Sequence, residues 1–249
     1  MRSVLLVLLL STGLALSSTN SASSLAQDAP RDPDRLYEDR AQLASGLEAA
    51  AIWEQRLTRD GRDFEAGWKL ARACYWLGSH VLADARRKQY ERGIAAATRA
   101  AAINSRRPEG HFWMAANMGA MAESFGLRAG LRYRGAVKRE LETALALDPS
   151  YEDGAADRAL GRWYLRVPGW LGGSKKASVE HLQRSLTYDP GSAASHFFLA
   201  ETFVAMDRTE DARRELQEVL DAPFHPDWVP EVNEFKQKAR ALLEKLRRP

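Results

Sequence analysis

The segment 166–176, RVPGWLGGSKK, is the first stretch of this chain to consider for chemistry, because glycines and lysines together can hold a phosphate group. A phosphate loop of the Walker type needs a strand, then Gly, four residues and Gly-Lys-Ser/Thr. Here Gly172 and Gly173 are followed by Ser174 before any lysine, and no strand pattern precedes them. The order is wrong for phosphate binding, so the sequence indicates a turn.

The same segment suits a break between two helices. Pro168 and Gly169 end a helix, because proline lacks the amide proton and glycine is flexible. Ser174 is typical of the N-cap of a following helix. Trp170 and Leu171 are apolar, so we expect them to fold back onto the flanking helices.

The other residues with catalytic potential show no pattern that supports a reaction. The histidines lack the spacing of a metal site such as HExxH, and Cys74 lies in an apolar helical stretch that favours burial over reactivity. There is no GxSxG elbow and no catalytic Cys–His signature. His196 occupies a packing position of the repeat described below. We therefore expect a non-enzymatic protein without a metal or other cofactor.

Composition places the chain among ordinary soluble globular proteins. Apolar residues make up 45% and charged residues 28% of its 249 residues, and the formal charge is +3. Basic residues are interleaved with acids along most of the chain. Nucleic acid is therefore not an expected partner.

The N-terminus has the order of a secretory signal peptide. Arg2 precedes an apolar run at residues 4–10, and small polar residues follow. The run is shorter than the roughly 20 apolar residues that span a bilayer, so no stable membrane insertion is expected. We predict a signal peptide at residues 1–26 with cleavage after Ala26, a flexible segment at residues 27–33, and a periplasmic or secreted protein.

Beyond residue 33 the apolar residues follow helical spacing, and two segments repeat without gaps. LETALALDPSYEDG begins at Leu141 and LQRSLTYDPGSAAS begins at Leu182, while IAAATRAAAINSRRPEG, from Ile94, is a looser copy. Each carries an apolar stripe, ends at or near a proline and opens another helix with small or polar residues. The pattern predicts stacked pairs of helices, because one hairpin cannot bury its apolar face alone.

These copies resemble the tetratricopeptide repeat, which implies an all-α superhelix of helical hairpins. In the last copy the motif's small residues, Ala200 and Ala212, are 12 residues apart; the spacing is 17 in the copy before and 21 in the first two, so three hairpins are lengthened. The matching second-helix positions are Gly93, Ala97 and Ala100; Val137, Leu141 and Ala144; Ser178, Leu182 and Ser185; Ala212, Leu216 and Val219.

We expect one helix before the repeats in the chain and one helix after them. Residues 34–59 show the pattern of one amphipathic helix. Residues 230–248 start with proline and end with basic residues, which is typical of a closing helix. The helical domain is therefore predicted to span residues 34–248.

A narrower resemblance rests on three stretches: PEGHFWMAANMGAMAESFG from Pro108, GRWYLRVPGWLGGSKKAS from Gly161 and ASHFFLAETF from Ala194. They are similar to the T-component proteins associated with TRAP-type tripartite periplasmic transporters. The resemblance implies a helical periplasmic protein that binds a periplasmic solute-binding protein and holds a small apolar ligand. No cysteine lies near the predicted cleavage point after Ala26, so a lipid anchor is not expected.

The repeat resemblance also implies which residues face a binding groove, because the first helix of each hairpin lines it. We also expect Trp170 and Lys175, in the turn at 166–176, to close over a ligand bound in the groove. A lining of rings, arginines and an amide suits an extended peptide or an amphipathic, anionic ligand. The alternative is that the aromatic members are buried between hairpins. The implied first-helix positions are Lys69, Ala73, Trp113, Asn117, Arg158, Arg162, Phe197 and Glu201.

We therefore expect an exported scaffold that binds a protein partner or a small amphipathic ligand, as an accessory of a periplasmic solute transporter. The alternative is an accessory scaffold for a cell-envelope enzyme that acts on carbohydrate or peptidoglycan. Solute-binding and permease genes beside this one would favour the first.

Overall fold

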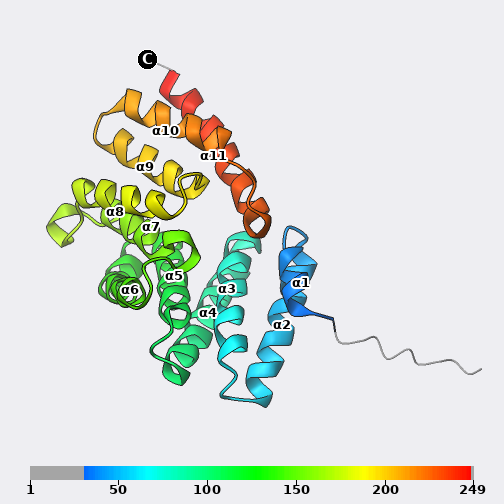
Figure 1. Cartoon of the computed structure of the whole chain (residues 1–249). Coiled ribbons are helices and arrows are strands. Elements are labelled where there is room, and N and C mark those ends of the chain that lie inside the picture. The colour runs from blue at the N-terminus through cyan, green and yellow to red at the C-terminus, as the bar shows by residue number, and fades with distance from the viewer. Residues whose placement is uncertain (1–30, 248–249) are drawn as a thin grey trace, which may run out of the picture. The chain divides into compact units, whose positions relative to one another are not determined.

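The computed structural model describes residues 31–247, and this part of the chain is helical apart from its turns (Figure 1). The predicted signal peptide and its cleavage after Ala26 lie outside the described residues. No strand occurs in residues 31–247. The helices are α1 Pro33–Glu38, α2 Leu43–Arg59, α3 Phe64–His80, α4 Ala83–Ile103, α5 Pro108–Ser124, α6 Gly126–Leu147, α7 Tyr151–Arg166, α8 Lys175–Tyr188, α9 Ala193–Ala205, α10 Thr209–Asp221 and α11 Val229–Arg247, with short 3-10 helices η1 Gly169–Leu171 and η2 Pro226–Trp228.

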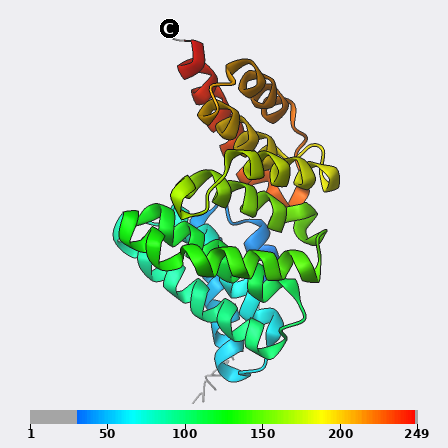
Figure 2. The ribbon, with the colours of Figure 1, turned by 90° about the vertical axis from the view of Figure 1, so that its left-hand side faces the viewer.

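Consecutive helices pair into four hairpins, α3–α4, α5–α6, α7–α8 and α9–α10, and each hairpin packs on the next (Figures 1 and 2). α1 and α2 precede the first hairpin, and α11 packs against α9 and α10 after the last. The all-α stack of hairpins predicted from the repeat is thereby confirmed.

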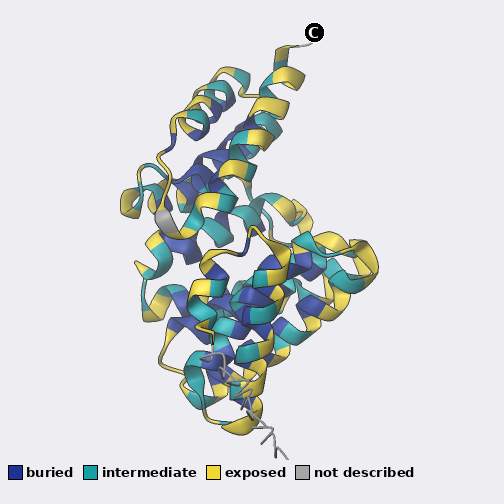
Figure 3. Cartoon of the chain, turned by 90° about the vertical axis from the view of Figure 1, so that its right-hand side faces the viewer, coloured by how far each residue is buried: buried dark blue, intermediate teal, exposed yellow. Residues whose placement is uncertain are grey.

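The register of the second helices is also as predicted. In α10 the buried side chains are Ala212, Leu216 and Val219, and the equivalent three positions of α4, α6 and α8 are buried too. These positions are spaced by four and three residues, so they lie on one helix face. Figure 3 shows the buried residues gathered where helices face one another.

Helix ends follow the local chemistry of the sequence. Asp148 and Asp189, each followed by proline, are the C-caps of α6 and α8, and Asn104 is the C-cap of α4. At the start of α8 the hydroxyl of Ser174 accepts a hydrogen bond from the amide of Ala177, which confirms the predicted N-cap.

The N-terminal segment differs from the single helix expected at residues 34–59. It forms α1 and α2, with a turn at residues 39–42 between them. The turn brings the side chain of Arg40 into the interior, where it is only 2% exposed. An uninterrupted amphipathic pattern could not reveal this break, because its cause is a contact with a distant part of the chain.

The segment RVPGWLGGSKK forms a turn that contains η1, as its sequence indicates. A Cβ at Gly173 would lie 1.7 Å from the carbonyl oxygen of Val167, so no larger residue fits there. The expected return of Trp170 onto the hairpin is wrong, because its side chain is 81% exposed.

Two apolar clusters make up the interior of the described residues. The first is built from α1 to α7 and the second from α8 to α11, and Trp228 packs against both. Cys74 belongs to the first cluster, and burial raises the pKa of its thiol to about 12, so it stays protonated at neutral pH. In residues 31–247 no helix combines the length and the apolar character needed to cross a bilayer.

Candidate functional site

A pocket of about 190 Å³ lies where the N-terminal segment, α3, α7 and η2 meet. We call it the Glu152 pocket. Four segments that are far apart in the chain contribute to it, so it exists only through tertiary structure. Its lining is Asp34, Tyr37, Glu38, Arg40, Arg72, Glu152, Asp227 and Trp228.

Arg40 forms the fixed part of the pocket. Its Nε and Nη2 atoms donate to the two carboxylate oxygens of Glu231, over 3.1 and 2.6 Å, and its guanidinium also donates to the backbone carbonyls of Tyr37 and Asp227. The carbon of the guanidinium lies 5.7 Å from the ring centre of Trp228. Because the carboxylate and carbonyl partners engage all three of its nitrogens, Arg40 joins the N-terminal turn to η2 and α11 and is not free to bind a ligand.

Arg72 is bound much less completely. It is stacked between the rings of Tyr37 and Trp68, at 4.3 and 5.0 Å. Its nearest carboxylate, Asp34, is 3.9 Å away and is already held at 2.8 Å by Lys69. Within residues 31–247 the buried Nε of Arg72 has no acceptor. An unpaired buried donor is costly, and the guanidinium that carries it lines the pocket.

Glu152 enters the pocket from a left-handed turn at the start of α7. Glu152, Asp153 and Gly154 have φ values of 47°, 54° and 74°, a conformation that costs free energy for the two non-glycine residues. Arg158 donates to the backbone carbonyls of Glu152 and Asp153, over 3.3 Å each, and so supports the turn. A strained turn held in this way aims the Glu152 side chain at the pocket.

The carboxylate of Glu152 has no hydrogen bond or ion pair with any residue that the structure describes, and the same holds for Glu38. Burial raises the pKa of Glu152, and the nearby charges of Arg72 and Arg158 offset part of that rise. Four acids and two arginines line the pocket, and one of those arginines is fully engaged. The pocket therefore offers unpaired negative charge beside the rings of Tyr37 and Trp228.

Trp113, Asn117 and Phe197, which were expected in an open groove, are buried instead. Asn117 is fully buried; its Nδ2 donates to the carbonyls of Ala71 and Trp113, and its Oδ1 packs against Gly93, where an added Cβ would lie 2.1 Å away. The close approach of α4 to α5 turns this amide inward. Phe197 is buried because Phe235 of α11 covers it, with ring centres 5.5 Å apart.

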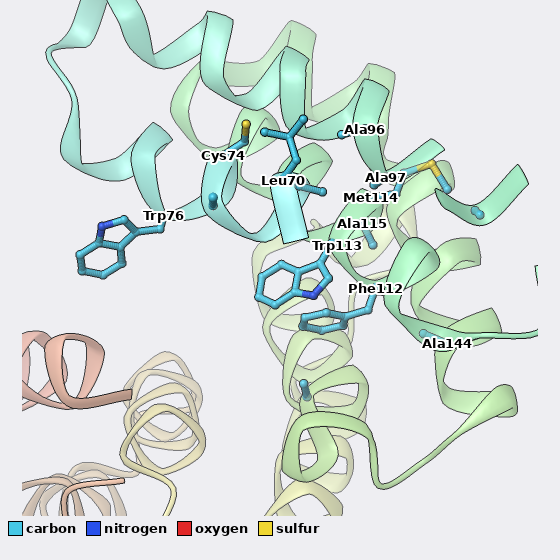
Figure 4. Packing of buried hydrophobic residues seen from close by; sticks show 14 of the residues in the cluster. Leu70, Cys74, Trp76, Ala96, Ala97, Phe112, Trp113, Met114, Ala115 and Ala144 are labelled. Atoms are coloured by element: carbon cyan, nitrogen blue, oxygen red, sulfur yellow. The ribbon is translucent and has the colours of Figure 1, made fainter. Parts of the chain in front are cut away.

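Trp113 is the third, and it lies between hairpins. Its ring is next to that of Phe112, with centres 5.0 Å apart (Figure 4), and 5.8 Å from that of Tyr75. Its Nε1 donates to the hydroxyl of Tyr151 over 3.0 Å. Trp113 thus packs behind the first residue of α7 and supports the turn that carries Glu152.

The structure brings Arg162 and Glu201 together, but they are already paired. Arg162 binds both carboxylate oxygens of Glu123, at 2.8 and 2.7 Å, and reaches Glu201 at 3.3 Å. Arg166 also binds Glu201, at 2.8 Å. This chain of charges links α5, α7 and α9 and leaves little charge free for a ligand.

The remaining predicted residues do not line the pocket. Lys69 holds Asp34, and Ala73 is fully buried. The ammonium group of Lys175 donates to the carbonyl of Ala205, and Trp170 points to solvent. Sequence reasoning missed Tyr37, Arg72, Glu152 and Trp228, whose spacing carries no signal because they meet only in the fold.

The described residues hold no cluster of three or more His, Cys, Asp or Glu side chains that could bind a metal ion. The pocket also lacks an activated nucleophile, since the one cysteine is buried elsewhere. Its lining offers charged groups and aromatic rings for the recognition of a ligand.

Solved structures confirm the architecture. The chain is similar to the thermophilic tetratricopeptide-repeat protein TTC0263 from Thermus thermophilus, with a TM-score of 0.64 and 19% identity over 85% of this chain and 97% of that one. It is also similar to residues 41 to the end of MamA from Desulfovibrio magneticus RS-1, with a TM-score of 0.50 and 16% identity over 84% and 98% of the two chains. At these identities the likeness concerns the fold alone. No curated protein matches the chain.

Sequence profiles of two families match successive parts of the chain. The tetratricopeptide-repeat profile matches residues 176–232, which contain the last hairpin. The profile described as regulator of microtubule dynamics protein 1-3 matches residues 31–170, which contain α1 to α7 and most of the Glu152 pocket. Since the second match covers more than half of the 249 residues, the chain belongs to the regulator of microtubule dynamics protein 1-3 family, and it is a tetratricopeptide-repeat protein.

Proposed function

We propose that this protein is a binding scaffold whose Glu152 pocket takes a basic side chain from an extended segment of a protein partner. One observation carries the proposal: a carboxylate without an ion partner in residues 31–247 lines a pocket with two aromatic rings. Tetratricopeptide-repeat proteins typically bind protein partners, and four hairpins supply a rigid frame for such a contact.

The lining favours a cation over other groups. An Arg or Lys side chain could pair with Glu152 and Glu38 while it contacts the ring of Trp228. Binding would also return a counter-charge to Glu152, whose burial disfavours the ionised form. The charged lining does not favour the small amphipathic ligand expected from the sequence.

Arg72 adds a reason for a peptide rather than a free ion. Its buried Nε lacks an acceptor in the described residues, and a shift of the guanidinium on binding would let a backbone carbonyl beside the basic side chain supply one. A segment in extended conformation presents a carbonyl and a side chain close together, which matches this pairing of an open donor with an open carboxylate.

The setting of this contact follows from the sequence. The signal segment at residues 1–26 supports export, and we infer that the mature protein begins at Gln27 in the periplasm. There, a solute-binding protein of a transporter or a cell-envelope enzyme would present the basic segment. The family description names regulators of microtubule dynamics, and a partner in that setting would have to present the same group.

Selection from a random peptide library displayed on phage, with the full chain as bait, tests the proposal. Selected peptides should share an Arg or Lys at one position, and their binding to Glu152→Gln should fall about tenfold or more, as for loss of a charged hydrogen-bonded contact. Glu218→Gln, a change of an exposed α10 carboxylate outside the pocket, is the matched control and should bind normally.

The raised pKa of Glu152 implies that the change Glu152→Gln does not unfold the protein, so a loss of binding reports on the pocket. A raised pKa means that the ionised carboxylate disfavours the folded state above the ordinary Glu range, so the amide should be at least as stable at neutral pH. Peptides without a shared basic residue, or peptides that bind Glu152→Gln and the parent equally, would contradict the proposal.

A further inference from the structure

The turns that join the two helices of the first three hairpins differ in charge from the rest of the chain. We call them the hairpin tips and define them as residues 81–88, 124–139 and 167–176. They contain ten Lys and Arg residues and one acid, Asp84, a formal charge of +9. The whole chain has +3, so the remainder has −6. Positive charge is thus concentrated in the tips.

The tips also carry the most exposed large apolar side chains outside the C-terminal region. Leu82 is 81% exposed, Leu127 74%, Leu131 48% and Trp170 81%. Exposed apolar residues are normal when scattered singly, but here each tip contributes at least one. Apolar groups that project from basic loops are costly to leave in water, which suggests that they are covered in use.

The start of α6 shows this most clearly. No residue from Gly126 to Ala136 is buried, although the segment is helical. Leu127 and Leu131 are one turn apart, as are Arg128 and Arg132, so leucines and arginines form adjacent rows on the helix. Neither arginine has an ion pair with a carboxylate of the described residues. Tyr133 packs against the first apolar cluster, and the exposed residues of the segment present a basic and apolar surface.

Contacts between hairpins bring the three tips to one edge of the stack. The guanidinium of Arg87, at the start of α4, lies 4.0 Å from the ring centre of Phe125, which joins the first tip to the second. Trp163, near the end of α7, donates from Nε1 to the carbonyl of Arg134 over 3.1 Å, which joins the second to the third. Neighbouring tips of stacked hairpins therefore form one continuous edge.

We propose that this edge docks on the surface of an anionic lipid bilayer, with Leu82, Leu127, Leu131 and Trp170 entering the interfacial layer. Leucine and tryptophan beside Lys and Arg are the combination that binds such interfaces. Each basic residue near the surface of an anionic leaflet adds to the attraction. The negative remainder of the chain would orient the tips toward the membrane.

A bilayer fits these residues better than an acidic protein does. A protein partner would need pockets that match each projecting side chain, because binding energy at protein interfaces comes from well-packed anchors. A bilayer adapts to separate projections without such pockets. Space around the tips is open as well: a Cβ added at Gly126, Gly130, Gly135 or Gly169 would meet no atom within 4 Å.

Vesicle sedimentation of the full chain tests the proposal. Binding to phosphatidylglycerol vesicles should exceed binding to phosphatidylcholine vesicles, and it should weaken as salt rises from about 0.1 M to 1 M, which shortens the Debye length from about 10 to about 3 Å. Arg128→Glu with Arg132→Glu should lower the partition coefficient about tenfold or more. Any vesicle binding by residues 1–26 is common to the parent and the variants, so it does not explain a difference between their partition coefficients.

Matched variants separate the tips from general charge. The control is Arg59→Glu with Arg106→Glu, which changes the net charge by the same amount as Arg128→Glu with Arg132→Glu. Both control arginines are exposed and lie in the turns at the opposite ends of the helices, so vesicle binding should stay unchanged. Brominated lipid should quench the parent's fluorescence more than that of Trp170→Phe, because only Trp170 among the tip residues can report entry into the bilayer.

Two results would overturn the proposal. One is equal vesicle binding by the parent and by Arg128→Glu with Arg132→Glu, with both folded by circular dichroism. The other is binding of the parent to poly-glutamate without binding to phosphatidylglycerol vesicles, which would assign the edge to an acidic protein surface instead.

Discussion

Helices α6 and α10 hold equivalent places in their hairpins, yet they differ greatly in how much of their length the core uses. α10 has 13 residues and buries Ala212, Leu216 and Val219. α6 has 22 residues and also buries three, Val137, Leu141 and Ala144, at the same spacing. The additional turns of α6 come before these three and contain no buried side chain.

The two hairpins share a second feature that marks them as copies. His111 in α5 donates from Nδ1 to the carboxylate of Glu140 over 2.8 Å, and His196 in α9 donates in the same way to Glu215 over 2.7 Å. The core face and this link are therefore common to both hairpins, whereas the extension of α6 is not. Packing explains the core face and the His–Glu link that both hairpins share. We assign the extension of α6 to binding, because a solvated extension contributes little to stability.

The largest loss of stability should come from substitutions at the core positions that α6 and α10 share. Leu141→Ala and Leu216→Ala should each lower the free energy of unfolding by about 2–5 kcal/mol, because both side chains are buried and leave a cavity. Leu131→Ala, in the extension, should change it by less than about 0.5 kcal/mol. Urea unfolding of the three variants measures this, and equal losses would mean that the extension is part of the core.

Gly161 should show the next largest effect. A Cβ at this position on α7 would lie 2.5 Å from Cγ of Leu182 on α8, inside a hairpin. Gly161→Ala should therefore destabilise the protein by about 1–3 kcal/mol through overpacking. Thermal unfolding followed by circular dichroism is sufficient, and a stability equal to that of the parent would show that α7 and α8 can separate at little cost.

A substitution at Gly135, in the extension of α6, should raise the stability and not lower it. It lies inside helix α6, and an added Cβ would meet no atom within 4 Å. Gly135→Ala should stabilise the protein by about 0.5–1 kcal/mol, because alanine loses less backbone freedom in a helix. The same thermal measurement compares it with Gly161→Ala, and a loss of stability here would indicate an unseen contact on the extension.

The smallest effect concerns pH and the His196–Glu215 pair. Burial acts to lower the pKa of His196, but hydrogen bonds to Glu215 and to the carbonyl of Pro190 outweigh it, so the pKa is raised. A raised pKa stabilises the fold fully below the ordinary value of about 6.5, and this contribution is lost as pH rises through the folded-state pKa. Urea unfolding from about pH 6 to pH 8 should show a decline that His196→Gln reduces.

Much of the hairpin architecture could be predicted from the chain itself. The four-then-three spacing of small and apolar residues survives in all four second helices, so their buried faces were predictable residue by residue. Proline after Asp148 and Asp189 marked two helix ends, and Ser174 marked a helix start. These signals are local: helix periodicity and capping depend on residues three or four positions apart.

The candidate site was predicted poorly, for a reason that Asn117 illustrates. The repeat motif assigned it to the groove, but by the equivalence of His111 and His196 it corresponds to Thr202, which is also buried. Its amide points between α3 and α4 because Gly93 leaves room for it. Whether a side chain on a given helix face meets solvent or a neighbour depends on the small rotation from one hairpin to the next. No spacing within one hairpin records that rotation.

The helical hairpins, their buried faces and their lengthened tips are therefore properties of the sequence, since each follows from spacing along a single helix or turn. The Glu152 pocket and the tip edge are properties of the stack. The pocket requires Arg40 to meet Glu231 across 191 positions of the chain, and the edge requires Arg87 to reach Phe125. Contacts between hairpins depend on the rotation from each hairpin to the next, and only the folded stack sets that rotation.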